Sequence, residues 1–176
     1  MNPWKCEKYK EFYTPGMQRR TGLRLHFYRS INGNIDCNAR LFLLNFAKWL
    51  RRNYEFPIRV NVYIKNSEFI RSLDGELVSA TFFAPFDRTL EPYAKISAGD
   101  YTALVKKYGT FSALCSTAAS LAHELTHYFQ WINGFDLSEK QAERQAKYYS
   151  EKIVYMFLDE GGEEFLERLG IIAEDN

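Results

Sequence analysis

Two histidines four residues apart, His123 and His127, enclose a glutamate in the stretch LAHELTHYFQ, residues 121–130. On a helix, residues at positions i and i+4 project from one face, so the two imidazoles can share one metal ion. Zinc suits imidazole ligands, and Glu124 projects to the side, where it can hold a metal-bound water rather than bind the ion itself. The pattern therefore predicts a zinc site on a helix.

The residues around this motif predict that the histidines lie on the polar side of the helix. His123 and His127 fall nearly opposite an apolar stripe. The stripe is made of Leu114, Ala118, Leu121, Leu125, Tyr128 and Ile132, and the histidines lie beside Ser116, Ala119, Ser120 and Gln130. Two solvated surface histidines without a metal would satisfy the same geometry, so that alternative stays open.

A catalytic zinc ion needs a third protein ligand and an open position for water. Acidic candidates follow in SEKQAERQAKYYSEKIV, residues 138–154, where Glu139 and Glu143 border the apolar stripe of a second helix and Glu151 points away. Glu143 is favoured because it lies in the second turn, whereas Glu139 lies in the first turn, which frays. The small Ala146 lets this helix approach the histidine helix closely. Glu139 remains the alternative, and either carboxylate could simply be stabilised by the helix dipole.

Together these residues resemble the gluzincin metallopeptidases, in which an HExxH helix precedes a helix that carries a glutamate ligand. The compact length is most similar to that of the minigluzincins. The resemblance implies one Zn²⁺ ion held by His123, His127 and Glu143, and hydrolysis of peptide bonds by a zinc-bound water that Glu124 activates as general base. It also implies an α+β fold, a single zincin-like domain in which a small three- to four-stranded sheet packs on the active-site helix and the glutamate helix.

One position departs from the family pattern. Lys147 stands four residues after Glu143, where thermolysin-type glutamate helices carry an aspartate that orients a ligand histidine. A backbone carbonyl or Glu139 is expected to take over that orienting role.

The elements that must position the site follow from periodicity, caps and turns. Asp36 and the pair Ser138 and Gln141 provide the N-cap and the capping box of two helices, and Gly134 stops the histidine helix. Strands are expected over 23–28, 58–64, 78–84 and 93–98, and helices over 37–52, 100–109, 110–132, 139–158 and around 165–169. Because Pro92 cannot donate a ladder hydrogen bond, the strand Tyr93 to Ala98 is expected at the sheet edge, where an extended peptide substrate would pair with it.

The 176 residues, 46% of them hydrophobic, can bury one core and are too few for two domains. We expect a single domain over 1–176, with an N-terminal extension over 1–36, a core over 37–158 and a C-terminal helix over 159–176. Either terminal segment is a candidate to cover the cleft and cause latency.

Composition bears on partners and on the compartment. A protein with a formal charge of +1 lacks a broad basic footprint, so no nucleic acid partner is expected. A small basic patch with two aromatic residues is the alternative, formed by Arg19, Arg20, Arg24, Arg29, Phe27 and Tyr28. No run of apolar residues could span a membrane and no secretory signal is visible, so a cytoplasmic protein without a membrane partner is expected. Three widely spaced cysteines, Cys6, Cys37 and Cys115, indicate neither a disulfide framework nor a cysteine zinc site.

The sequence is compatible with two functions from different classes. The first is a zinc metallopeptidase, and the alternative is a catalytically silent zinc- or protein-binding module on the same scaffold. Replacing Glu124 discriminates them, because only a peptidase loses turnover while keeping zinc.

Overall fold

The computed structural model describes residues 1–14, 16–17, 19–28, 33–72 and 75–171 of the chain. Its elements are η1 (Pro3–Lys5), α1 (Tyr9–Phe12), β1 (Leu23–Tyr28), α2 (Cys37–Asn53), β2 (Val60–Lys65), β3 (Ile70–Arg71), β4 (Leu77–Val78), β5 (Ala80–Phe83), β6 (Tyr93–Ser97), α3 (Tyr101–Ile132), α4 (Glu139–Phe157), η2 (Leu158–Gly162) and α5 (Glu163–Arg168). The expected mixed α+β class is confirmed. None of the helices within the described ranges is both long and apolar enough to cross a membrane.

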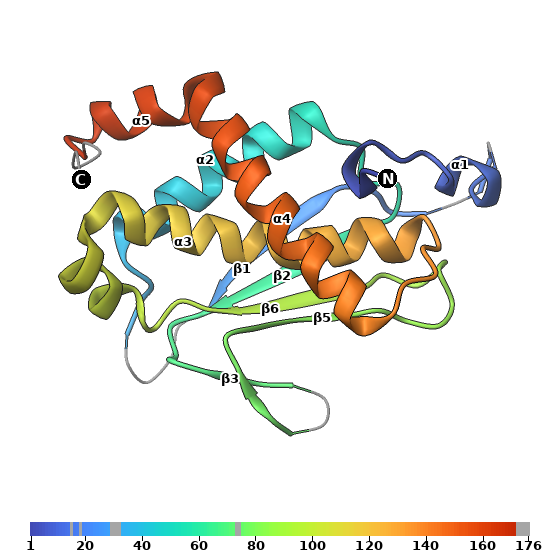
Figure 1. Ribbon diagram of the computed structural model, residues 1–176, viewed down its shortest axis with the longest axis horizontal. Coiled ribbons are helices and arrows are strands. Elements are labelled where there is room, and N and C mark those ends of the chain that lie inside the picture. Colours follow the sequence, from blue (N-terminus) through green and yellow to red (C-terminus); the bar gives the residue numbers. More distant parts are fainter. Residues whose placement is uncertain (15, 18, 29–32, 73–74, 172–176) are drawn as a thin grey trace.

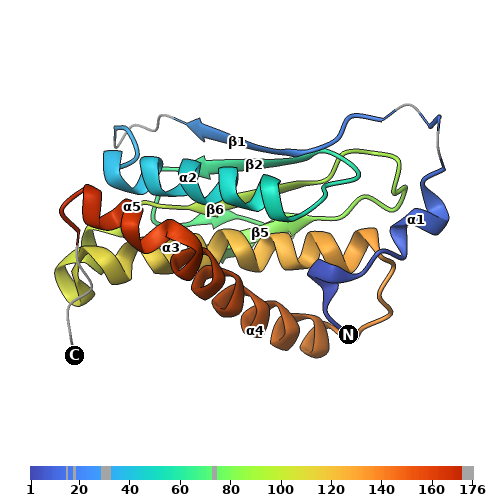
Figure 2. The same ribbon diagram turned by 90° about the horizontal axis from the view of Figure 1, so that it is seen from above.

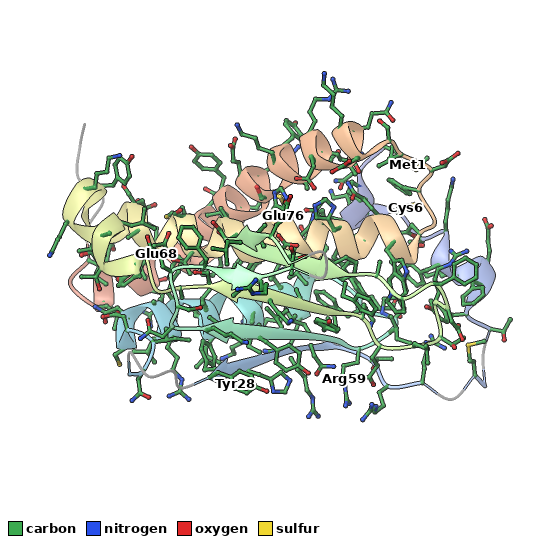
Figure 3. The ribbon with its side chains drawn as sticks, turned by 90° about the horizontal axis from the view of Figure 1, so that it is seen from below. Met1, Cys6, Tyr28, Arg59, Glu68 and Glu76 are labelled. Atoms are coloured by element: carbon green, nitrogen blue, oxygen red, sulfur yellow. The ribbon has the colours of Figure 1, made fainter. Side chains whose placement is uncertain are left out.

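A four-stranded sheet in the order β1-β2-β6-β5 forms one layer of the molecule. The strands β1, β2 and β6 are parallel, and β5 is antiparallel to β6. Figures 1 and 2 show α2 and α3 on the same face of this sheet, with α4 crossing over α3. In the view of Figure 3, from the other side, the sheet lies in front of the helices.

The core lies between the sheet and its helices. Val60, Val62 and Ile64 alternate inward from β2 and are fully buried. The predicted stripe of α3 is fully buried as well, from Leu114 through Tyr128 to Ile132. The hydroxyl of Tyr128 donates to the carbonyl of Ile58 over 2.8 Å, which ties α3 to the segment that leads into β2. Burial of this stripe fixes the rotation of α3, and so determines that its opposite side carries the histidines.

The predicted ends of the helices are confirmed at several positions. Asp36 accepts hydrogen bonds from the backbone N–H groups of Asn38 and Ala39, and the capping box of Ser138 and Gln141 starts α4. The predicted boundary between helices 100–109 and 110–132 is present as a break within α3. Gly109 has φ 80° and ψ 165°, which lie outside the helical region.

The strand over Tyr93 to Ala98 was predicted at the sheet edge, and this prediction is wrong. β6 pairs with β2 on one side and with β5 on the other, so its backbone groups are used in the sheet. Pro92 lies just before the strand, and its missing N–H therefore removes no ladder bond. β5 is the edge strand on this side of the sheet.

The strand predicted over 78–84 is divided in two. A bend at Ser79 separates β4, which pairs with β3 in a small antiparallel hairpin, from β5, which joins the main sheet. The break leaves β5 short, and it places Ser79 at the start of the strand that borders the histidine helix. The turn predicted at Asp74 and Gly75 falls partly outside the described residues.

Residues 1–36, which were predicted as an extension, contribute to the core. β1 is paired with β2 along its whole length, and Trp4, Tyr9 and Tyr13 are each at most 5% exposed. The indole N–H of Trp4 donates to Oγ1 of Thr126 over 2.9 Å, within the histidine helix itself. The predicted boundary at residue 37 is therefore not a boundary of the core.

Replacing Trp4 with alanine should lower the free energy of unfolding by about 3 kcal/mol, because the indole leaves a large cavity beside Tyr54 and Phe129. Chemical denaturation followed by circular dichroism measures this loss. Phe86→Ala is the matched control, since that side chain is fully exposed and its removal should cost less than about 0.5 kcal/mol. A Trp4→Ala protein as stable as the wild type would show that the N-terminal segment is dispensable for the fold.

Candidate metal centre

The two histidines project from α3 toward α4, on the side opposite the buried stripe. Their side chains remain 26% (His123) and 17% (His127) exposed, so they are neither core residues nor free surface groups. α4 packs against α3, and Ala146 is fully buried on its inner face. Glu143, one turn before Ala146, is thereby brought to the histidines.

Three candidate ligand side chains converge at this point. Nε2 of His123 lies 3.2 Å from Oε2 of Glu143, and Nε2 of His127 lies 3.0 Å from Oε1 of the same carboxylate. The two Nε2 atoms are 3.2 Å apart. Zinc with bonds of about 2.0–2.1 Å and tetrahedral angles places neighbouring ligand atoms about 3.3 Å apart. The spacing of the three donors therefore fits a zinc ion between them.

The other two acidic candidates are not part of this cluster. Among the described residues, His123, His127 and Glu143 form the group of His, Cys, Asp or Glu side chains whose geometry could hold a metal ion. Glu139 in the first turn of α4 is exposed, and Glu151 borders a different surface hollow with Tyr148 and Tyr155. The structure thus brings Glu143, the carboxylate that the sequence favoured, to the two histidines.

Gln130 determines which ring nitrogen of His127 carries the proton. Nδ1 of His127 lies 2.8 Å from Oε1 of Gln130, one turn along α3. An amide oxygen only accepts, so Nδ1 carries the proton and donates it. In the neutral ring Nε2 is then unprotonated, and its lone pair faces the site. For His123, burial and the neighbouring His127 lower the pKa, which also favours the neutral ring that a metal needs.

The amide orientation of Gln130 is itself fixed by two acceptors on α4. Its Nε2 donates to the carbonyl of Ala142 over 3.1 Å and to Oε1 of Gln145 over 3.0 Å. Gln145 in turn donates from Nε2 to the carbonyl of Met1 over 3.2 Å. Figure 3 shows Met1 and Cys6 together beside the first turns of α4. A row of hydrogen bonds therefore runs from the amino terminus to the imidazole of His127.

Sequence reasoning did not assign a role to Gln130 or Gln145. A backbone carbonyl or Glu139 was expected to orient a ligand histidine. In the structure, the side chain of Gln130 accepts the hydrogen bond that orients His127. The available signal was Gln130 on the histidine face of the helix, three residues after His127, where an i, i+3 contact is possible. The orientation of the Gln130 amide also depends on α4, and the sequence alone does not predict how α4 packs on α3.

Replacing Gln130 with leucine should weaken zinc binding about 10- to 100-fold, because Nδ1 of His127 loses the acceptor that orients the ring. Zinc competition with a chromophoric chelator measures the affinity. Thr117→Val is the matched control. It removes a buried hydroxyl that donates to Ala113 on the same helix and touches neither histidine, so it should leave zinc affinity unchanged. Equal affinity of Gln130→Leu and wild type would show that Gln130 orients nothing.

Glu124 lies beside His123, His127 and Glu143, the three candidate ligands that we call the metal cluster, and it is only 5% exposed. Burial raises its pKa to about 8, and the negative charge of Glu143 acts in the same direction. A cation held by Glu143 and the histidines would favour the ionised carboxylate instead. The arrangement thus provides a desolvated carboxyl whose proton affinity depends strongly on the charge beside it, as general acid–base chemistry requires.

The surface is hollowed on both sides of His123 and Glu124. One cleft of about 400 Å³ extends along β5, between this strand, the end of α3 and the start of α4. A second of about 390 Å³ lies beside the start of β5 and an earlier part of α3. Neither cleft is lined by a residue of the N-terminal segment 1–36 or of the segment 159–171. The described parts of these two segments therefore do not cover the site. Tyr148 and Tyr149 do not line them either.

No family model matches the chain, and neither a curated protein nor a solved structure matches it. The assignment of function therefore rests on the residues and on their geometry.

Proposed function

We propose that this chain is a zinc-dependent metallopeptidase that hydrolyses peptide bonds. The observation that carries the proposal is the convergence of His123, His127 and Glu143 within ligand distance of a common point, beside the buried carboxyl of Glu124. The order of a histidine helix followed by a glutamate helix supports the resemblance to the gluzincins, and the small sheet on α3 is consistent with a zincin-like domain.

The donor set suits zinc in number and in kind. Two imidazole nitrogens and one carboxylate are the protein ligands of several catalytic zinc sites, and three ligands leave a position open. Zinc bound there would act as a Lewis acid toward the substrate carbonyl and lower the pKa of water to about 7. Gln130 keeps the lone pair of His127 directed at the site, and Glu143 presents one oxygen to each imidazole.

The proton steps fall to Glu124. As the attacking water adds to the carbonyl carbon, Glu124 accepts a proton from it, so the oxygen reaches the carbon as hydroxide. The carbon–nitrogen bond then breaks, and Glu124 returns the proton to the departing nitrogen, which leaves as an amine. The carboxyl ends the cycle as it began, and its low exposure keeps bulk water from competing for this proton.

The edge of β5 provides the surface on which a peptide could extend. The N–H of Ser97 donates to the carbonyl of Ser79 over 2.8 Å, so in this antiparallel ladder Thr81 and Phe83 also form the hydrogen-bonded pairs with β6. The backbone groups of Ala80 and Phe82 therefore point away from β6. Within the described residues no strand pairs with this side of β5. The substrate strand predicted for Tyr93–Ala98 is accordingly proposed for β5.

Activity is tested by incubating zinc-loaded protein with an unfolded protein substrate and identifying new termini by mass spectrometry. Cleavage that stops when a chelator is added and returns with zinc is the expected result. A zinc-loaded protein that cuts no peptide bond would favour the silent binding module.

A further inference from the structure

The two clefts that flank the metal cluster differ in chemistry. The cleft that extends along β5 contains four large apolar side chains, Phe82, Trp131, Phe135 and Leu137, which we call its apolar half, beside the polar side chains of Thr81, Gln130 and the candidate metal ligands. The cleft near the start of β5 is walled by small side chains, with hydroxyl groups from Ser79, Ser116, Ser120 and Ser150. His123, Glu124 and Ala80 border both clefts, so the candidate reaction centre lies between the bulky side chains of the apolar half and the small side chains of the second cleft, its polar half.

The order of these halves is the same along both elements that form them. Along β5, Ser79 comes first and Phe82 follows. Along α3, Ser116 and Ser120 precede His123, and Trp131 follows His127. The apolar half therefore lies toward the carboxyl ends of both β5 and α3.

The direction of a bound peptide follows from strand pairing. A peptide that pairs antiparallel with β5, the more stable arrangement, runs from the Phe82 end toward the Ser79 end. Its residues on the amino side of the cleaved bond then lie over the apolar half. Its residues on the carboxyl side lie over the serines.

We propose that this protein selects peptide bonds with a bulky apolar residue on the amino side and a neutral polar residue on the carboxyl side. The inference rests on the proposed peptidase function. Trp131 and Phe135 are the specificity residues of the first position, because burial of an apolar side chain against them removes its surface from water. Ser116 and Ser120 are those of the second position.

The hydroxyls of the polar half favour a substrate group that donates hydrogen bonds. Ser120 donates to the carbonyl of Ser116 over 3.2 Å, and Ser150 donates to the carbonyl of Lys147 over 2.8 Å, so the lone pairs of both oxygens stay available. Apart from His123 and Glu124, the residues that line this half carry no charge. A side chain such as asparagine or serine would meet these acceptors without bringing a charge into the cleft.

The experiment uses a peptide library prepared from a trypsin-digested cell extract, incubated with the zinc-loaded full chain and read by mass spectrometry. Cleaved bonds should show phenylalanine, leucine, tyrosine or tryptophan on the amino side and asparagine, glutamine, serine or threonine on the carboxyl side. The reverse order, or an absence of preference, would overturn the inference while leaving the peptidase function in place. Absence of any cleavage by the zinc-loaded chain would instead count against the proposed function, and the inference would fall with it.

Two variants connect the preference to the named residues. Phe135→Ser should reduce the preference for a bulky residue on the amino side about tenfold and leave the carboxyl-side preference unchanged. Phe86→Ser is the matched control, because Phe86 is fully exposed and lines neither cleft. Ser116→Leu should shift the carboxyl-side preference from polar toward apolar residues. If both cleft variants keep the wild-type preference, the clefts do not select the substrate.

Discussion

Glu124→Gln should lower the rate of peptide hydrolysis by about 10²- to 10⁴-fold while leaving zinc affinity within a few-fold of the wild type. Glutamine has nearly the same shape as glutamate but cannot accept the proton of the attacking water. Glu124 is only 5% exposed, which limits the water molecules that could take over its role as proton acceptor. Steady-state hydrolysis of a quenched fluorescent peptide gives the rate, and chelator competition gives the zinc affinity.

The same variant separates a peptidase from a silent binding module. A module that only binds zinc or a protein would bind equally well with glutamate or glutamine at position 124. Thr117→Val is a suitable control for the activity assay as well, because it alters α3 without touching the metal cluster. Full activity of Glu124→Gln would remove Glu124 from the reaction and leave the proposed mechanism without its base.

Glu143→Ala should reduce zinc affinity by more than about 100-fold, since a direct ligand contributes more than an orienting partner, whose loss costs about 10- to 100-fold. Glu143 presents one oxygen to each imidazole, so its removal also leaves the two rings without their common neighbour on α4. Metal content after dialysis, measured by atomic absorption, should fall from one zinc per chain to near zero.

Glu139→Ala is the matched control for that experiment. The two glutamates lie one turn apart on α4, and both are exposed, but Glu139 is not part of the metal cluster. We expect Glu139→Ala to retain one zinc per chain. Loss of zinc in Glu139→Ala with retention in Glu143→Ala would assign the third ligand to the first turn of the helix.

Much of this molecule is determined locally by its sequence. The 3.6-residue period of apolar residues from Leu114 to Ile132 fixed which side of the helix would be buried, and hence that His123 and His127 would share the other side. Asp36 and the pair Ser138 and Gln141 marked the helix starts, because the side chains of Asp36 and Gln141 accept hydrogen bonds from backbone N–H groups in the same turn. The break at Gly109 is local as well, since it requires a backbone conformation that glycine adopts easily.

Contacts between distant segments were decided only by the tertiary structure. The sequence predicted a strand over 93–98, begun by Pro92, but the place of this strand between β2 and β5 depends on how four segments pair, which no residue within the strand encodes. Trp4 belongs to the core because it packs on α3, more than a hundred residues away. Similarly, Gln130 orients His127 only because Ala142 and Gln145 on α4 hold its amide. The sequence by itself determined the chemistry and the faces of each element, whereas the packing of α4 on α3 and the order of the strands decided which of these groups meet.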